Sequence, residues 1–147
     1  MKATTALAGG MAGAVTLNLI HELYRQIDPD APKIHLIGEE ALVKMLTAAN
    51  LPVPSDEKEL YKWTLAGDIL SNTIYFSLIG ASKKKHLIKN GLLLGFAAGL
   101  GAVFMPEKMG LNDAPTTRTI ETKLLTVLWY TLGGLTAGSV MKVLRKK

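Results

Sequence analysis

The chain has no cysteine among its 147 residues. This absence excludes disulfide bonds, thiolate metal sites and cysteine nucleophiles, and it is compatible with either redox compartment. Aromatic residues make up only 6% of the sequence, whereas 48% of it is hydrophobic. So apolar a composition in so short a chain predicts one small membrane domain over residues 1–147, in place of an ordinary soluble domain.

Carboxylates are missing from long parts of the chain. All twelve lie within two stretches, at positions 22–68 and 107–121. Elsewhere nine cations occur without any acid: Lys2, Lys83, Lys84, Lys85, Lys89, Lys142, Arg145, Lys146 and Lys147. Because Lys and Arg accumulate on the cytoplasmic side of membrane proteins, this pattern predicts a multi-pass protein of the bacterial plasma (inner) membrane with both termini cytoplasmic.

The formal net charge of +5 does not indicate nucleic-acid binding. The basic residues cluster at the ends of apolar segments and do not line one polar face, so no nucleic-acid partner is expected. The expected partners are the lipid bilayer and either further copies of the chain or another membrane protein.

Four apolar segments predict four transmembrane helices, at about residues 3–26, 58–82, 86–105 and 117–144. The third is expected to end before Pro106. A signal peptide is the competing interpretation of the first, because Ala12-Gly13-Ala14 resembles a cleavage site, but the apolar run that continues beyond it favours a retained helix. The predicted fold is an all-α integral membrane protein, a four-transmembrane-helix bundle.

Glycines recur at four-residue spacing within these segments. Such spacing places small residues on one helix face, where backbones can approach closely, and it therefore predicts tight helix packing. The glycines concerned are Gly9 and Gly13, then Gly91, Gly95 and Gly99, and finally Gly134 and Gly138.

The first outer loop, residues 27–57, is predicted to contain a short amphipathic helix. Its beginning, 28–32, holds two prolines and is expected to be extended. After Gly38, apolar residues recur at helical spacing over 41–49, which predicts a helix on the outer membrane surface or capping the bundle. Ser55 is the predicted N-cap of the next helix. The tripeptide Asp-Ala-Pro occurs once in each outer loop, at 30–32 and 113–115, as an internal duplication would produce.

Asp68 is the main candidate for a functional group, because an ionisable side chain at membrane depth costs about 2.5 to 3.5 kcal/mol even on insertion scales. It belongs to a polar stripe on one helix face, which must face protein or water and not lipid. The stripe consists of Thr64, Asp68, Ser71, Asn72 and Tyr75.

Two other helices carry polar faces in their outer halves. One comprises Asn18, His21, Glu22 and Arg25, and the other comprises Thr119, Lys123, Thr126 and Tyr130. We expect the first, second and fourth helices to bring these faces together around an acidic cavity that opens to the outside. The predicted ligand- or ion-binding residues are Asp68, Asn72, Asn18, His21, Glu22, Arg25 and Lys123.

A divalent metal is an alternative occupant of this site. Imidazole nitrogens and carboxylate oxygens are ligands that zinc, iron or manganese prefer. The predicted ligands would be His21, Glu22, His35, Glu39 and Asp68. Their spacing matches neither HExxH nor a Glu-x-x-His pair. In a purely structural interpretation, Arg25 and Lys123 neutralise Glu22 and Asp68 without doing any chemistry.

No phosphate-binding loop, GxSxG elbow, paired-carboxylate signature or nucleotide fingerprint occurs. The favoured function is the binding or translocation of an ion, a proton or a small polar solute. Asp68 would be the ion or proton site, Asn18 and Asn72 would supply oxygen ligands, and His21 with Glu22 would form the outer gate. The alternatives are a membrane-embedded metal-dependent or lipid-acting enzyme, and a structural or accessory subunit of a membrane complex.

Overall fold

The protein is all-helical in the computed structural model, which describes residues 1–145 and contains no strand in that range. Four helices are long: α1 (Ala3–Tyr24), α3 (Glu57–Ser77), α4 (Leu87–Lys108) and α6 (Ile120–Leu144). Four elements are shorter: α2 (Ile34–Ala48), α5 (Ala114–Thr117) and the 3-10 turns η1 (Leu78–Ala81) and η2 (Lys84–His86). The all-α prediction is confirmed for the described residues.

Three helical segments of the described chain are long and apolar enough to cross a membrane, namely Ala3–Tyr24, Lys84–Lys108 and Ile120–Leu144. They indicate a membrane protein. The predicted second span, α3, is not among them, because its polar stripe lowers its hydropathy.

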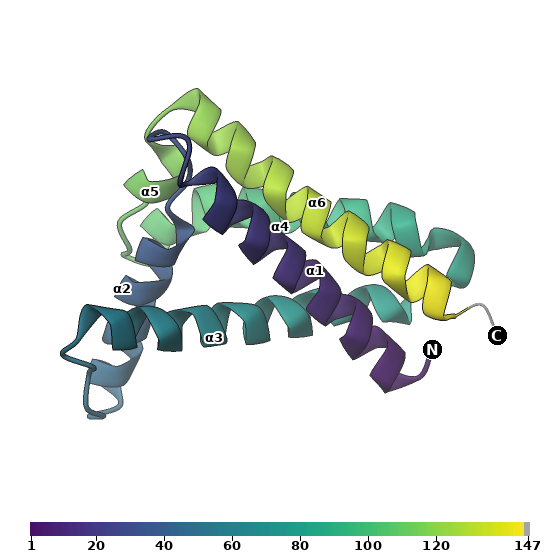
Figure 1. The fold of residues 1–147 in the computed structure, drawn as a ribbon. Helices are drawn as coiled ribbons and strands as arrows, with labels where there is room; N and C mark the ends of the chain where they lie inside the picture. Colours follow the sequence, from purple (N-terminus) through teal and green to yellow (C-terminus); the bar gives the residue numbers. More distant parts are fainter. Residues whose placement is uncertain (146–147) are drawn as a thin grey trace.

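The long helices form a continuous series of contacts. α1 packs against both α3 and α6, and α6 packs against α4, whereas α3 touches α4 at few points (Figure 1). Buried apolar side chains from these helices fill the space between them, the largest being Trp129, Phe76, Ile79, Leu87 and Met141. Trp129 and Tyr130 of α6 both pack inside the protein.

Glycine permits the close contact between α4 and α6. A Cβ atom on Gly91 would lie 2.3 Å from the carbonyl oxygen of Gly134, and one on Gly95 would lie 2.5 Å from that of Tyr130. Gly101 is on the same helix, but it has nothing within 4 Å of the equivalent position. The predicted packing role of the regularly spaced glycines is therefore confirmed, since any side chain there would force the backbones apart.

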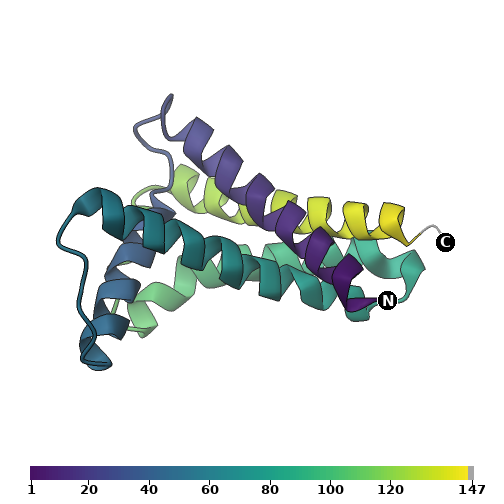
Figure 2. The same ribbon diagram turned by 60° about the horizontal axis from the view of Figure 1, so that its bottom comes forward.

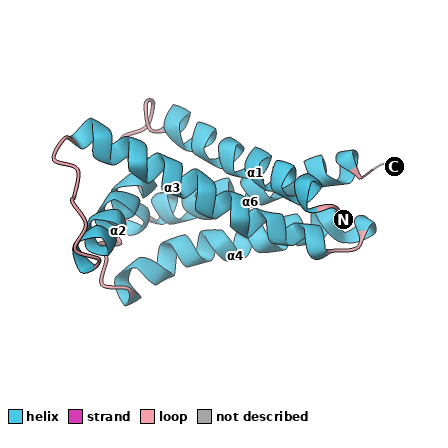
Figure 3. Cartoon of the chain, turned by 90° about the horizontal axis from the view of Figure 1, so that it is seen from below, coloured by secondary structure: helices cyan, strands magenta, loops and turns pink. Residues whose placement is uncertain are grey.

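The two termini lie at the same end of the molecule as the turn between α3 and α4 (Figures 1 and 3). We call this the basic end, defined by residues 1–2, 82–86 and 142–145. Arg145 crosses it and donates a hydrogen bond of 2.8 Å to the Ser82 carbonyl.

The opposite end, defined by residues 25–57 and 107–121, is called the acidic end. Here the two Asp-Ala-Pro loops meet directly. The Lys33 backbone N–H donates to the Pro115 carbonyl at 2.9 Å, and Arg118 forms an ion pair of 2.5 Å with Asp30. The Thr122 hydroxyl donates to the Asp30 carbonyl at 3.0 Å. The acidic end is thus closed by contacts between segments about ninety residues apart.

α2 crosses the acidic end at a steep angle to α3 (Figures 1 and 2). It begins at Ile34, seven residues before the predicted periodic region, and it continues through Gly38. Glu40 accepts a hydrogen bond of 2.8 Å from the Asn112 N–H, and Lys44 pairs with Glu40 and donates to the Gly110 carbonyl. These contacts attach α2 to the loop that follows α4.

Two predicted helix boundaries are wrong. α3 is capped by Asp56 and not by Ser55, since the Asp56 carboxylate accepts the Glu59 N–H at 3.1 Å. α4 does not end before Pro106 but continues to Lys108.

Pro106 has no N–H to donate to the carbonyl of Ala102, one turn earlier. The hydroxyl of Thr116 supplies the missing donor at 3.0 Å, and Thr116 is completely buried. A side chain of the following segment therefore replaces the helical hydrogen bond, and the proline is tolerated within the last turn of the helix.

Because the Thr116 hydroxyl replaces the N–H that Pro106 lacks, we expect the effects of mutating Thr116 and Pro106 on the free energy of unfolding to be coupled. Thr116→Val should lower the free energy of unfolding by about 1 to 3 kcal/mol, because it leaves the Ala102 carbonyl buried without a partner. In a Pro106→Ala background, residue 106 regains its N–H and the same substitution should cost less. Unfolding of the four proteins in detergent measures the difference. Equal costs in the two backgrounds would contradict this role for Thr116.

Candidate functional site

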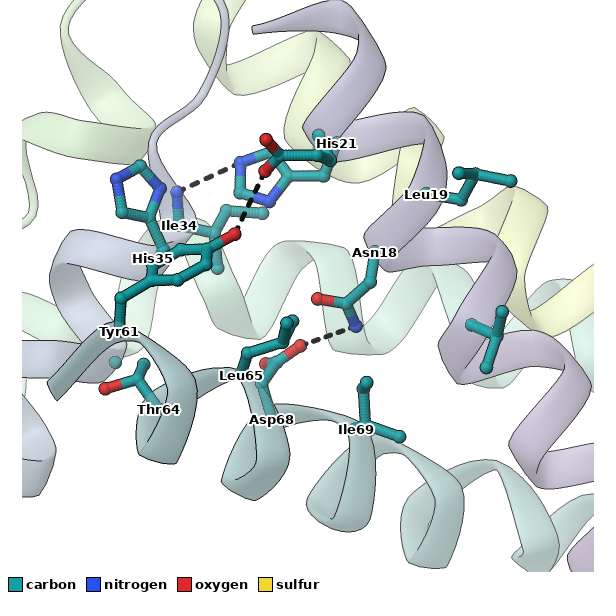
Figure 4. Close-up of a pocket in the computed structure, with 13 residues that line it drawn as sticks. Asn18, Leu19, His21, Ile34, His35, Tyr61, Thr64, Leu65, Asp68 and Ile69 are labelled. Atoms are coloured by element: carbon teal, nitrogen blue, oxygen red, sulfur yellow. Dashed lines mark hydrogen bonds between the residues drawn. The ribbon is translucent and has the colours of Figure 1, made fainter. Parts of the chain in front are cut away.

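A cavity of about 230 Å³ lies between α1, α2 and α3, towards the acidic end (Figure 4). Its lining residues on α1 are Val15, Asn18, Leu19, His21 and Glu22, on α2 Ile34, His35 and Gly38, and on α3 Tyr61, Thr64, Leu65, Asp68 and Ile69. Asp68 therefore lies in the wall of a cavity that three helices form.

Asp68 is held in this wall by two amides. One carboxylate oxygen accepts a hydrogen bond of 2.8 Å from Asn18, and the other accepts one of 3.0 Å from Asn72, one turn further along α3. The Asn18 amide also donates to the Ala14 carbonyl at 3.0 Å, which fixes its orientation. Both amides donate N–H bonds to the carboxylate, but an amide is neutral, so neither supplies a positive charge.

Within residues 1–145 the ion pairs are Arg25–Glu22, Lys44–Glu40 and Arg118–Asp30, and none of them involves Asp68. The predicted partner, Lys123, is exposed on α6 and does not line the cavity. When ionised, Asp68 thus contributes a negative charge that the protein does not neutralise by direct contact.

Thr64 lies one turn before Asp68 and also lines the cavity. It is only 6% exposed, and its hydroxyl has no hydrogen-bond partner within residues 1–145. A buried hydroxyl without a partner costs free energy. Its oxygen is enclosed by protein atoms, so a ligand in the cavity would reach it only if the side chain moved.

Glu22 at the cavity rim is already satisfied. One of its oxygens pairs with Arg25 at 2.8 Å, and the other accepts the Tyr61 hydroxyl at 3.0 Å. The Arg25 guanidinium lies 5.6 Å from the centre of the Tyr61 ring. The structural interpretation is therefore correct for Glu22, whose charge is neutralised, and it is not met for Asp68.

His21 holds the chain that enters α2. Its Nε2 lies 2.5 Å from the Pro32 carbonyl oxygen and 3.2 Å from the Ile34 nitrogen. In one tautomer Nε2 donates to the carbonyl, and in the other it accepts from the N–H. Its ring also packs 5.3 Å from that of Trp129. Because this nitrogen is engaged by the backbone in either tautomer, His21 has a structural contact in addition to its place in the cavity wall.

His35 is neutral at physiological pH. Burial lowers its pKa from its ordinary value of 6.5 to about 4, and the nearby positive charge of Arg25 contributes in the same direction. An Arg25 nitrogen lies 3.4 Å from Nε2 of His35. Since guanidinium can only donate, Nε2 is the acceptor and the proton of this histidine is on Nδ1.

Four of the five predicted metal ligands, His21, Glu22, His35 and Asp68, line the same cavity, but they are not close enough together to hold a metal ion. Nowhere in residues 1–145 do three His, Asp or Glu side chains form a group able to hold a metal ion. Glu39 lies away from the cavity, in a hollow beside Glu57, where burial and that second carboxylate raise its pKa. The divalent metal predicted on His21, Glu22, His35, Glu39 and Asp68 therefore has no assembled site.

The third wall of the cavity was assigned to the wrong helix. The sequence predicted it from the fourth transmembrane segment, now α6, whereas α2 provides it. On α6, Thr122 binds the Asp30 carbonyl and Thr126 donates to the Thr122 carbonyl at 2.8 Å. The buried Tyr130 of the same predicted face lies next to Asn72 and close to Asp68.

Gly38 is the sequence signal for this wall that was missed. A Cβ atom there would lie 2.7 Å from Cγ2 of Thr64, so glycine lets α2 close onto α3. From the sequence, the helix was instead predicted to begin after Gly38.

Comparisons with known proteins add no relative. No protein-family model, curated protein or solved structure matches the chain. Its function is therefore argued from the geometry of the cavity.

The low pKa of His35 predicts acid sensitivity. Between pH 6.5 and about 4 the unfolded chain binds a proton that the folded protein excludes, so stability falls as the pH is lowered through this window. His35→Gln should flatten the dependence of the unfolding midpoint on pH. His86→Gln, an exposed histidine at the basic end, is the matched control and should leave it unchanged. Parallel pH curves for the wild type and His35→Gln would contradict the assignment.

Proposed function

We propose that α1, α3, α4 and α6 all cross the bilayer. At 21 residues α3 is about 31 Å long, close to the thickness of the hydrocarbon core. Most of its polar stripe faces the protein, since Thr64 and Asn72 are buried and Asp68 bonds to α1. Ser71 is exposed, and its hydroxyl donates to the Asp68 carbonyl. The exposed side chains of α3 also include Leu70 and Ile74, which suit lipid. A low average hydropathy is therefore compatible with a spanning helix whose polar face is covered.

The proposed orientation places the basic end in the cytoplasm of a bacterium and the acidic end outside the plasma membrane. The separation of charge along the helices supports it, because the basic end carries Lys2, the lysines of the 82–86 turn and Arg145. The carboxylates, apart from Asp68 and Glu22, lie in the segments that join the helices at the acidic end or in the turns of the long helices next to those segments.

We further propose that the cavity binds a cation or a proton at Asp68, either as a receptor site or as a step in translocation. One observation carries this proposal: a carboxylate within the helical layer accepts two amide hydrogen bonds, has no cationic partner and lines a cavity. An intramembrane acid of this kind commonly marks an ion or proton pathway.

Access to the cavity is proposed to come from the acidic end. Towards the basic end α1 and α3 are in close contact, since a Cβ atom on Gly10 would lie 2.4 Å from the Thr73 carbonyl. Translocation would require this contact to open, whereas simple binding would not.

The topology is testable because the chain has no native cysteine. Lys108→Cys and Lys84→Cys are matched substitutions at exposed positions of opposite ends. In intact cells a membrane-impermeant maleimide should label the first, whereas the second should react only after the membrane is permeabilised. Equal labelling of both in intact cells would overturn the proposed orientation.

Asp68→Asn tests the binding site. The amide is nearly isosteric, but it cannot carry the negative charge, and one of its two hydrogen bonds to neighbouring amides is lost at a cost of about 1 to 3 kcal/mol. In the wild type, raising the concentration of a bound cation at constant pH should raise the unfolding temperature. The Asn variant should fold and lose this dependence. A folded variant that keeps the full dependence would exclude Asp68 as the site.

A further inference from the structure

The walls of the cavity are mostly hydrocarbon. Its apolar lining residues are Val15, Leu19, Ile34, Leu65 and Ile69, contributed by all three helices. Figure 4 shows Leu65 and Ile69 on either side of Asp68 along α3. Asp68 therefore carries the one negative charge in this largely apolar cavity that is unpaired within residues 1–145, because Glu22, which also lines it, pairs with Arg25.

This lining does not suit a bare hard cation. Mg²⁺ and Ca²⁺ require about six to eight oxygen ligands. The unpaired oxygens near Asp68 are few, because Glu22 is occupied by Arg25 and Tyr61. The protein atoms could replace only part of the hydration shell of such an ion.

A primary ammonium group matches the polar atoms better. It has three N–H donors and no acceptor. Asp68 offers two carboxylate oxygens, and each accepts only one hydrogen bond from a neighbouring amide, so each keeps acceptor capacity. An ammonium ion could bond to these oxygens and supply the positive charge that none of the ion pairs within residues 1–145 gives to Asp68.

The size of the cavity indicates that the ligand has an apolar part. A volume of about 230 Å³ is several times the roughly 30 Å³ that one water molecule occupies in the liquid. Filling it with water alone would place many molecules against hydrocarbon, with few protein groups to bond to. A hydrocarbon body would displace such water and contact the apolar walls.

We propose that the cavity binds a small amphipathic primary amine, with its ammonium on Asp68 and its hydrocarbon part against Leu65 and the other apolar walls. This inference rests on the proposed function, in which Asp68 binds a cation, and it adds the chemical class of that cation.

Titration calorimetry of the full-length protein in detergent, at neutral pH and constant ionic strength, tests the proposal. The probe is phenethylammonium. Three matched compounds separate its features: 2-phenylethanol lacks the charge, phenylacetate reverses it, and methylammonium lacks the hydrocarbon body. Sodium chloride tests an inorganic cation. We expect saturable binding of phenethylammonium that is at least about tenfold tighter than that of each other compound, as for a charge-assisted bond combined with apolar burial.

Variants assign the two halves of the site. Asp68→Asn should weaken phenethylammonium binding at least about tenfold. Leu65→Trp should fill part of the chamber and exclude phenethylammonium, while methylammonium keeps its weak dependence on Asp68. Leu124→Trp, on the exposed side of α6, is the control for a large apolar substitution and should bind normally.

Three results would overturn the proposal in different ways. If sodium or methylammonium binds as tightly as phenethylammonium and Asp68→Asn abolishes it, the site takes a simple cation and only the amine class is wrong. If Leu65→Trp binds phenethylammonium like the wild type, the hydrocarbon part lies outside the cavity and the proposal fails. If no cation binds in a manner that depends on Asp68, the proposed function fails as well.

Discussion

The hydrogen bond from Asn18 of α1 to Asp68 of α3 is the interaction on which the arrangement of α3 depends. α3 carries a polar stripe, and α1 presents an amide at the height of the Asp68 carboxylate, while Asn72 bonds to the same carboxylate from within α3. Turning this stripe towards α1 leaves Leu70 and Ile74 outside. The polar stripe then lines the cavity, which α1 and α3 form together with the shorter helix α2. Stability and the candidate site therefore have a common origin.

A second constraint acts on the other side of the molecule. Gly91 and Gly134 bring α4 and α6 within backbone contact, and Gly13 does the same between α1 and α6. Between α3 and α4 there is little contact apart from points such as the hydrogen bond from the Tyr75 hydroxyl to the Leu94 carbonyl, at 3.0 Å. The molecule thus combines a tightly packed layer of three helices with a fourth helix that is held mainly along one face.

Much of this could be predicted from single-sequence patterns. Long apolar runs and four-residue glycine spacing predict elements and local contacts, so the all-α class and the close packing at Gly91 and Gly95 were correct. The juxtaposition of Asn18 and Asp68 followed from their positions on polar helix faces. The position of α2 could not be derived in this way, because it is set by contacts distant in sequence, such as that between Lys33 and Pro115. The continuation of α4 through Pro106 likewise depends on a hydroxyl ten residues later.

The separation of α1 from α3 changes along their length. Near the basic end Gly10 brings them into backbone contact, whereas near the acidic end the cavity and α2 lie between them. The two helices are therefore close together at one end and separated at the other, and the hydrogen bond between Asn18 and Asp68 joins them partway along their length. Loss of the charge on Asp68 weakens this charge-assisted hydrogen bond, so the contact between the two helices at this height depends on the ionisation of the carboxylate.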